Sequence, residues 1–412
     1  MEPIVVVALV VTLALFFDFT NGFHDTANAM ATPIATGALK PRTAVLIAAV
    51  MNLVGAFLST AVATMISVSM INEGIELRPE IVFAGLTGAI LWNLTTWFLG
   101  LPSSSSHALF GGLIGAVIAA YGFMGVNFVK VIEKILIPAL FAPIIAGLAA
   151  WFATRLAYSI TKRATDDDVA TGRGRFRYGQ IFSSSLVALS HGTNDAQKTM
   201  GVITLVLVAG GLQESGDHVQ LWVVVSAALA IAAGTYSGGW RIIKTMGKGL
   251  SEIKAPQGLA AEIASAATIL ASSKLGFALS TTQVASGAII GSGLGRKGGK
   301  VRWTKAGHVV LGWLFTLPAA AIVGAISAWL VGTGPAGIII DGIITVGVIL
   351  AIFQIARRNA VTHKHVASEI EEASEVVLTK KQRTAEAKQA TAATKSASKS
   401  GAKNSGKGKG KK

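Results

Sequence analysis

Long apolar stretches recur along most of this 412-residue chain, and they restrict its fold more than any other feature. Stretches of about 20 apolar residues match the hydrocarbon layer of a membrane, which is about 30 Å thick. We therefore expect an all-α polytopic membrane protein of roughly 10–12 transmembrane helices. The expected spans are 3–36, 43–71, 81–99, 103–121, 131–157, 180–210, 219–239, 257–275, 279–295, 306–331 and 338–356.

The segments between the spans alternate in charge, which predicts the orientation of the chain. Because cytoplasmic loops are enriched in Lys and Arg, we expect a multi-pass plasma-membrane protein with one crossing per span, its N-terminus outside and its tail in the cytoplasm. The first span is expected to be retained, because it lacks the leading cation and the cleavage site of a signal peptide. The basic segments are 40–42, 162–177, 241–254, 296–305 and the tail, whereas 72–80, 213–217 and 332–335 are acidic or neutral.

The C-terminal segment 357–412 differs in composition from the rest of the chain. It is rich in Lys, Ser, Ala and Gly and carries most of the net charge of +15, so we predict a disordered cytoplasmic tail. Contact with anionic lipid is an alternative role. We do not predict nucleic-acid binding, because no aromatic interleaving or recognisable module accompanies the basic residues.

Two motifs occur twice, in the same order. The segment around Asp25 (GFHDTANAM) matches the segment around Asp195 (GTNDAQKTM), and Ser104-Ser-Ser-His107 matches Ser280-Thr-Thr-Gln283. The first aspartate motif leads into a basic loop and the second into an acidic one, so the two halves run in opposite directions. We therefore expect an inverted-topology internal repeat with interrupted helices or helical hairpins. The predicted boundaries are 1–159 for the first membrane repeat, 160–179 for a basic cytoplasmic loop, 180–356 for the second repeat and 357–412 for the tail.

The duplicated aspartates lie in apolar sequence. An ionised carboxylate near the membrane centre costs at least about 2.5–3.5 kcal/mol, so it needs a partner or a bound cation. Lys198 lies one helical turn from Asp195 and can pair with it, whereas Asn28 takes the matching position beside Asp25. The predicted coupling-ion residues are Asp25, Asn28, Asn194 and Asp195, and the predicted modulating residues are His24, His107, His191, Gln197 and Lys198.

The duplicated hydroxyl motifs are suited to an anion. Hydroxyls and free N–H groups at a helix N-terminus bind anions, and the helix dipole adds to this attraction. Two such ends facing each other would enclose a tetrahedral oxyanion without a fixed positive charge. The predicted anion-binding residues are Ser104, Ser105, Ser106, Ser280, Thr281 and Thr282. Asp18, Glu262 and Asp341 have no repeat partner and are expected to be structural.

These motifs resemble the signatures of the inorganic phosphate transporter (PiT) family, in particular its bacterial low-affinity Pit members. The resemblance rests on residues 21–32, 103–116, 190–201 and 279–292, and it extends over residues 3–356. It implies an inverted-repeat transporter, often a homodimer, that holds phosphate between the two hydroxyl motifs. The second of these motifs commonly ends in His in the family, whereas this chain has Gln283.

Phosphate symport with a cation is therefore the predicted function. The three histidines beside the motifs can titrate in the physiological range, which favours a proton over sodium as the coupling ion. Phosphate could cross as a neutral complex with a divalent metal. Sodium coupling, or a permease for sulfate or another oxyanion, are the alternatives. A membrane hydrolase is disfavoured because no Gly-x-Ser-x-Gly motif is present, and a channel because the carboxylates beside the anion site suit coupling. We predict no enzymatic activity, no resident metal and no cofactor beyond the transported cation.

Overall fold

The computed structural model describes residues 3–358 apart from 70, 73–74, 161–174 and 217, together with a few residues between 361 and 368. The chain forms two compact units, Met1–Val361 and Thr362–Lys412. Most of the predicted tail, and most of the predicted loop 160–179, lie outside the described residues. Everything below concerns the first unit.

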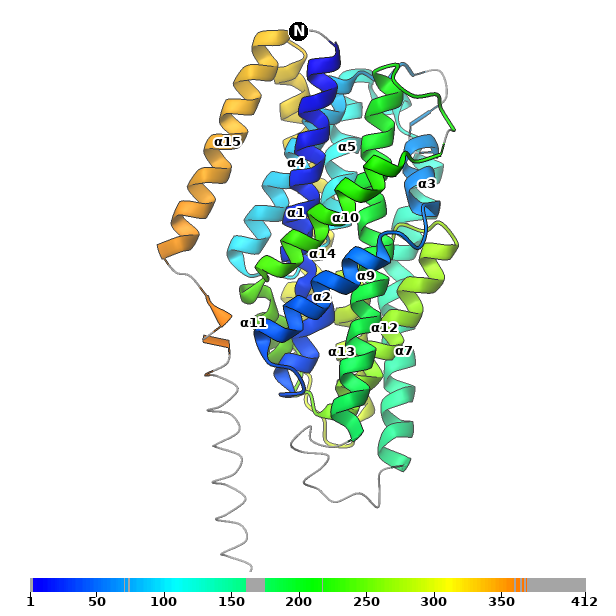
Figure 1. The fold of residues 1–412 in the computed structure, drawn as a ribbon, viewed down its shortest axis with the longest axis vertical. Coiled ribbons are helices and arrows are strands. Elements are labelled where there is room, and N and C mark those ends of the chain that lie inside the picture. Colours follow the sequence, from blue (N-terminus) through cyan, green and yellow to red (C-terminus); the bar gives the residue numbers. More distant parts are fainter. Residues whose placement is uncertain are drawn as a thin grey trace, which may run out of the picture. The chain divides into compact units, whose positions relative to one another are not determined.

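This unit is all-helical, as predicted, and two isolated β-bridges are the only extended pairings among its described residues (Figure 1). The first half contains α1 (Pro3–Ala35), α2 (Pro41–Gly55), α3 (Ala61–Ser69), α4 (Pro79–Leu99), α5 (Ser105–Tyr121), η1 (Phe123–Gly125), α6 (Phe128–Val131), η2 (Ile132–Leu136) and α7 (Ile137–Ile160). The second half contains α9 (Arg175–Ala209), α10 (Leu221–Ser237), α11 (Trp240–Gly249), α12 (Ala255–Lys274), α13 (Thr281–Gly295), α14 (Trp303–Val331) and α15 (Pro335–Arg358).

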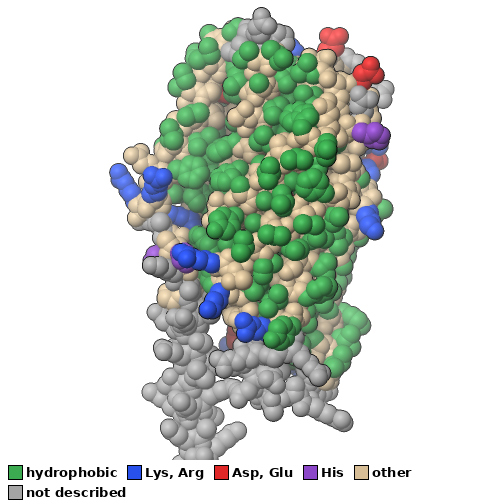
Figure 2. Space-filling model, in the orientation of Figure 1, with side chains coloured by type: hydrophobic (Ala, Val, Ile, Leu, Met, Phe, Trp, Pro, Cys, Tyr) green, Lys and Arg blue, Asp and Glu red, His purple; other side chains and the backbone are tan. Residues whose placement is uncertain are grey.

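Several helices are long and apolar enough to cross a membrane. Among the described residues these are α1, α4, the continuous α6–η2–α7 segment, α14 and α15, and the bent pair α10–α11 would add a sixth. Large apolar side chains cover the outside of the bundle (Figure 2), and a surface of this kind cannot face water. The protein is therefore a polytopic helical membrane protein.

Charged side chains are distributed unequally between the two ends of the bundle. Lys and Arg gather over the lower part of the face in Figure 2, whereas Asp and Glu lie at its upper right. We call the end at which α1 ends and α9 and α12 begin the basic end, and the opposite end the far end (Figure 1).

The two halves interlock through glycines. A Cβ at Gly22 of α1 would lie 2.4 Å from the Ile231 carbonyl oxygen of α10, and a Cβ at Gly192 of α9 would lie 2.2 Å from the Asn52 oxygen of α2. Each aspartate-bearing helix therefore packs closely against a helix of the other half. Only glycine allows two backbones to approach this closely.

The helices that follow the hydroxyl motifs repeat this exchange. Gly115 of α5 packs against Ala321 of α14, and the matching Gly291 of α13 packs against Gly147 of α7. Equivalent glycines thus make equivalent close contacts with one long helix of the opposite half, α14 for Gly115 and α7 for Gly291. The inverted repeat predicted from the motifs is present in the fold, while its exact residue boundaries stay a prediction.

The expectation of one crossing per span is wrong for spans 103–121 and 279–295. The helices α5 and α13 begin inside the bundle, since their N-cap residues Ser104 and Ser280 are buried. Short buried segments, 101–104 and 278–280, lead to these starts from the ends of α4 and α12. The predicted hairpins are confirmed, and their tips bring the hydroxyl motifs into the core.

Candidate functional site

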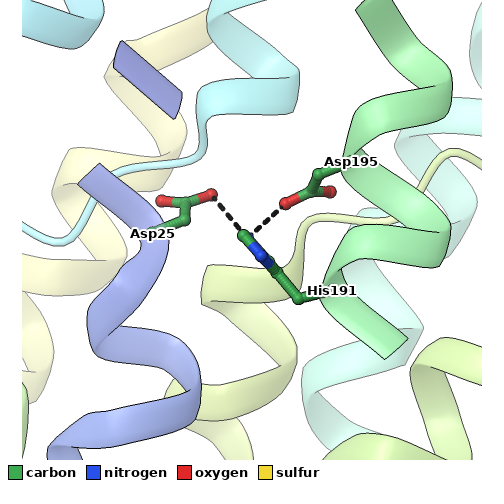
Figure 3. Close-up of side chains that lie close together, drawn as sticks. All are labelled: Asp25, His191 and Asp195. Carbon is green, nitrogen blue, oxygen red and sulfur yellow. Dashed lines mark ion pairs between the residues drawn. The ribbon is translucent and has the colours of Figure 1, made fainter. Parts of the chain in front are cut away.

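The two duplicated aspartates meet where α1 and α9 pass each other. Figure 3 shows Asp25 of α1 and Asp195 of α9 on either side of His191. The Nε2 atom of His191 lies 2.6 Å from Asp195 Oδ2 and 3.8 Å from Asp25 Oδ2. All three side chains are buried. One imidazole therefore bridges carboxylates that come from opposite repeats.

These three residues form a candidate cation site. Their ligand atoms, two carboxylate oxygens and one imidazole nitrogen, lie within 4.8 Å of one another. Carboxylate oxygens suit hard cations, and a neutral imidazole can serve as an additional ligand. The geometry thus allows the site to hold either a cation or protons shared between the three groups.

Asp25 is also bound by groups from both hairpin tips. His24 Nδ1 lies 2.5 Å from Asp25 Oδ1. Ser105 at the start of α5 donates to Oδ2 at 2.6 Å, and Thr282 at the start of α13 donates to Oδ1 at 3.2 Å. The structure therefore joins one aspartate to both predicted anion motifs.

Asp195 is compensated by a fixed charge. The ammonium of Lys198 pairs with Asp195 Oδ1, and Thr281 donates to Oδ2 at 3.0 Å. The same ammonium donates to Ser106 Oγ at 2.5 Å and to the Leu279 carbonyl at 2.9 Å. The expectation that the helix ends enclose no fixed positive charge is therefore wrong, because Lys198 reaches both tips.

Asn28 completes the contact between α1 and the second tip. Its Nδ2 donates to the hydroxyls of Thr281 and Thr282 at 3.2 and 3.1 Å. Its Oδ1 is buried and has no hydrogen-bond partner within the described chain. This oxygen is therefore available as a ligand, as the sequence predicts.

Ser104 and Ser280 have a different place from their neighbours. The Ser104 hydroxyl accepts from His107 N at 3.1 Å, and that of Ser280 accepts from Gln283 N at 3.3 Å. Both are N-caps, which are preferred positions for serine. The N–H groups before the capped ones have no partner within the helix, so they remain able to bind an anion.

Asn194 and Gln197, two of the predicted residues, bind groups outside this cluster. Asn194 donates to Ser273 Oγ at 2.9 Å, and Gln197 Oε1 accepts from Val62 N at 2.7 Å. His107 is buried in α5, where its backbone N–H donates to the Ser104 hydroxyl. Their predicted roles stay predictions.

Polar residues outside the predicted site orient the histidines. Asn52 Oδ1 lies 3.2 Å from His191 Nδ1, and Ser103 Oγ lies 3.3 Å from His24 Nε2. Thr96 lies 3.4 Å from the same nitrogen. The sequence held one sign of Asn52's role, since it carries the single side-chain amide in the apolar run 43–71. An isolated polar group at membrane depth needs a partner.

Comparisons with known proteins agree with this arrangement. Residues 21–324 match the phosphate transporter family. The chain is 55% identical over 361 residues to the probable low-affinity inorganic phosphate transporter of Mycobacterium leprae, covering 87% of this chain and 86% of that one. Identity to the corresponding Bacillus subtilis protein is 42% over 329 residues, covering 79% and 96%. A solved sodium-dependent phosphate transporter shares the fold, with a TM-score of 0.67 and 22% identity over 80% of this chain and 99% of that one. The chain therefore belongs to the phosphate transporter family.

Proposed function

We propose that the protein carries inorganic phosphate across the plasma membrane in symport with a monovalent cation, and that this cation is the proton. The observation that supports the proposal most directly is the meeting of two buried carboxylates, one from each repeat, with the N-termini of α5 and α13. An anion and a cation bound side by side reduce each other's cost of entering the membrane.

The hairpin tips provide the chemistry for phosphate. Free N–H groups at two helix starts, the hydroxyls of Ser105, Ser106, Thr281 and Thr282, and the Lys198 ammonium are all donors. Asp25 and Asp195 can accept a hydrogen bond from protonated phosphate. Fully ionised sulfate has no proton with which to donate such a bond. The donor set binds any oxyanion, and the carboxylates favour phosphate.

The coupling ion follows from the partners of the carboxylates. Each aspartate has an imidazole nitrogen within 2.6 Å, His24 for Asp25 and His191 for Asp195. A carboxylate and an imidazole in hydrogen-bond contact can hold a proton between them, so a proton needs no further ligand at these pairs. Sodium is the alternative, because the Asn28 Oδ1 oxygen is unpaired and the fold is shared with a sodium-dependent transporter.

Uptake of labelled phosphate into proteoliposomes tests the proposal, with proton and sodium gradients imposed separately. We expect an inward proton gradient to drive saturable accumulation of labelled phosphate. Unlabelled phosphate should inhibit this accumulation by competition, and sulfate should not. Accumulation driven by sodium at constant pH, with no response to the proton gradient, would assign sodium instead. Omitting divalent metals in a parallel series tests whether phosphate crosses as a metal complex.

The orientation of the chain is part of the proposal. The positive-inside rule places the basic end in the cytoplasm. Since the chain has no cysteine, Ser215→Cys at the far end and Lys297→Cys at the basic end are directly interpretable, and both positions are exposed. An impermeant thiol reagent should label Ser215→Cys on intact cells and Lys297→Cys only after permeabilisation. Labelling of both from the same side contradicts the orientation.

A further inference from the structure

Asp18 is a buried carboxylate that forms no ion pair with the described residues. It lies on α1, seven residues before Asp25, and therefore two turns or about 10 Å nearer the far end. Its side chain has 0% exposure, and neither carboxylate oxygen has a hydrogen-bond partner in the described part of the chain. An ionised carboxylate at membrane depth without a counter-charge is costly, so this group has to take up a cation.

The surroundings of Asp18 supply further oxygen atoms. The Thr199 hydroxyl of α9 lies beside the carboxylate and is itself buried without a completed hydrogen bond. The buried side-chain oxygens of Asn21 on α1 and Asn93 on α4 also lack partners, and Asn93 Nδ2 donates to Thr20, two residues from Asp18. Side-chain oxygens without a partner are the kind of ligand that a hard monovalent cation requires.

The charged groups around Asp18 are all accounted for. On α9 they are His191, Asp195 and Lys198, and on α1 they are His24 and Asp25. The helix α10 contains no charged residue, and α4 contains only Glu80, in its first turn. Lys198 is already paired with Asp195, so no fixed positive charge remains for Asp18 among the described residues of these helices.

This feature belongs to one repeat only. The position seven residues before Asp195 is Ala188, which is buried in apolar surroundings. Towards the far end from Asp18, α1 and α9 carry buried apolar side chains such as Val10 and Val206. Asp18 therefore lies along α1 between these apolar residues and the central cluster.

We propose that Asp18 and Thr199 form a second cation-binding station, which takes up one monovalent cation in each transport cycle before or after the central site. This inference rests on the proposed symport. The shared chemistry is the neutralisation of one carboxylate by one positive charge, supplied by a proton or by a sodium ion. A cation that binds to and leaves Asp18 in each cycle can couple its own movement to that of phosphate. The fixed charge of Lys198 cannot do this.

The test compares Asp18→Asn with Asp341→Asn in proteoliposomes. Asp341 is a matched control, because it is also a buried membrane carboxylate, bound by Thr87 and Ser327 away from the central cluster. Reversal-potential measurements give the number of cations moved per phosphate. We expect Asp18→Asn to lower this ratio by one while saturable phosphate uptake persists, and Asp341→Asn to keep the wild-type ratio. A wild-type ratio in Asp18→Asn would overturn the inference.

A second variant covers the case in which Asp18→Asn does not fold or does not transport. Thr199→Val keeps the side-chain shape and removes the hydroxyl. It should raise the cation concentration for half-maximal uptake about tenfold, with the phosphate KM unchanged. The ion whose titration shifts, proton or sodium, identifies the occupant. An unchanged titration for both ions contradicts the station, whereas the absence of any cation dependence in the wild type contradicts the symport itself.

Discussion

Asp25 and Asp195 occupy equivalent positions in the two repeats but are neutralised in different ways. Asp25 contacts His24 and the hydroxyls of Ser105 and Thr282, so its partners are either neutral or titratable. Asp195 has the ammonium of Lys198 beside it. The inverted repeat thus supplies two similar carboxylates, of which only one has a permanent counter-charge.

The histidines show the same exchange between the repeats. His24 directly precedes Asp25, and Asn194 takes that place before Asp195. Four residues before the aspartates, the first repeat has Asn21 and the second has His191. Each repeat therefore keeps one histidine beside its aspartate, at a different position of the motif. Duplication thus set the geometry of the site, and later substitutions gave its two halves different electrostatic roles.

Neutralising each aspartate in turn is expected to give the largest effect. Asp25→Asn and Asp195→Asn should each lower coupled phosphate uptake about 70- to 400-fold, since an uncompensated charge at membrane depth costs about 2.5–3.5 kcal/mol. Uptake in proteoliposomes measures the effect, and thermal unfolding checks that the variants fold. Asp341→Asn serves as the control for removing a buried carboxylate. Wild-type uptake in either variant would show that transport does not require the charge of that aspartate.

The duplicated motifs explain how much of this site could be predicted from the sequence. They identified Asp25, Asp195, Asn28, Lys198 and the hydroxyl residues, because polar residues at membrane depth are costly and therefore conspicuous. The sequence could not show that Lys198 reaches Ser106 and Leu279, since that contact depends on how two distant tips pack. It likewise gave no reason to pair Asn52 with His191.

The loop charges predicted the topology only in part. A pair of full crossings and a hairpin whose second helix starts in the core both return the chain to the same end. Charge alternation therefore could not reveal that α5 and α13 begin inside the bundle at Ser105 and Thr281. The runs of serine and threonine were the only local sign, because such residues favour helix starts.

One substitution would make the two repeats alike at the position three residues after the aspartate. Lys198→Asn places at the second aspartate the side chain that Asn28 supplies at the first. Without the ammonium, Asp195 needs a mobile cation, so proton-driven uptake should fall about tenfold and dependence on sodium should appear. Uptake at several sodium concentrations and constant pH measures this change.

Lys274→Asn is the control for the loss of a lysine, because this side chain is exposed at the end of α12. It should leave both the rate and the ion dependence unchanged. If Lys198→Asn behaves like this control, the fixed charge on Asp195 has no part in ion selection.

The packing of the hairpins should respond equally in the two repeats. A Cβ at Gly115 would lie 1.9 Å from the Ala321 oxygen, and a Cβ at Gly291 would lie 2.0 Å from the Gly147 oxygen. Gly115→Ala and Gly291→Ala should each lower stability by about 1–3 kcal/mol. Gly312→Ala, where no atom lies within 4 Å of the new Cβ, is the control. A large loss in one variant only would show that the repeats do not pack equivalently.

The N-caps should give the smallest effect, and they separate helix support from substrate contact. Ser104 and Ser280 each cap a hairpin helix, so Ser104→Ala and Ser280→Ala should each lower stability by about 1 kcal/mol. Ser104→Asn and Ser280→Asn should recover most of it, because asparagine caps as well as serine. Ser105→Ala, in contrast, removes a donor to Asp25 and should raise the phosphate KM with less change in thermal unfolding. If the asparagine variants restore stability but not the KM, then the capping hydroxyls also bind phosphate, as the sequence predicts for all six hydroxyls.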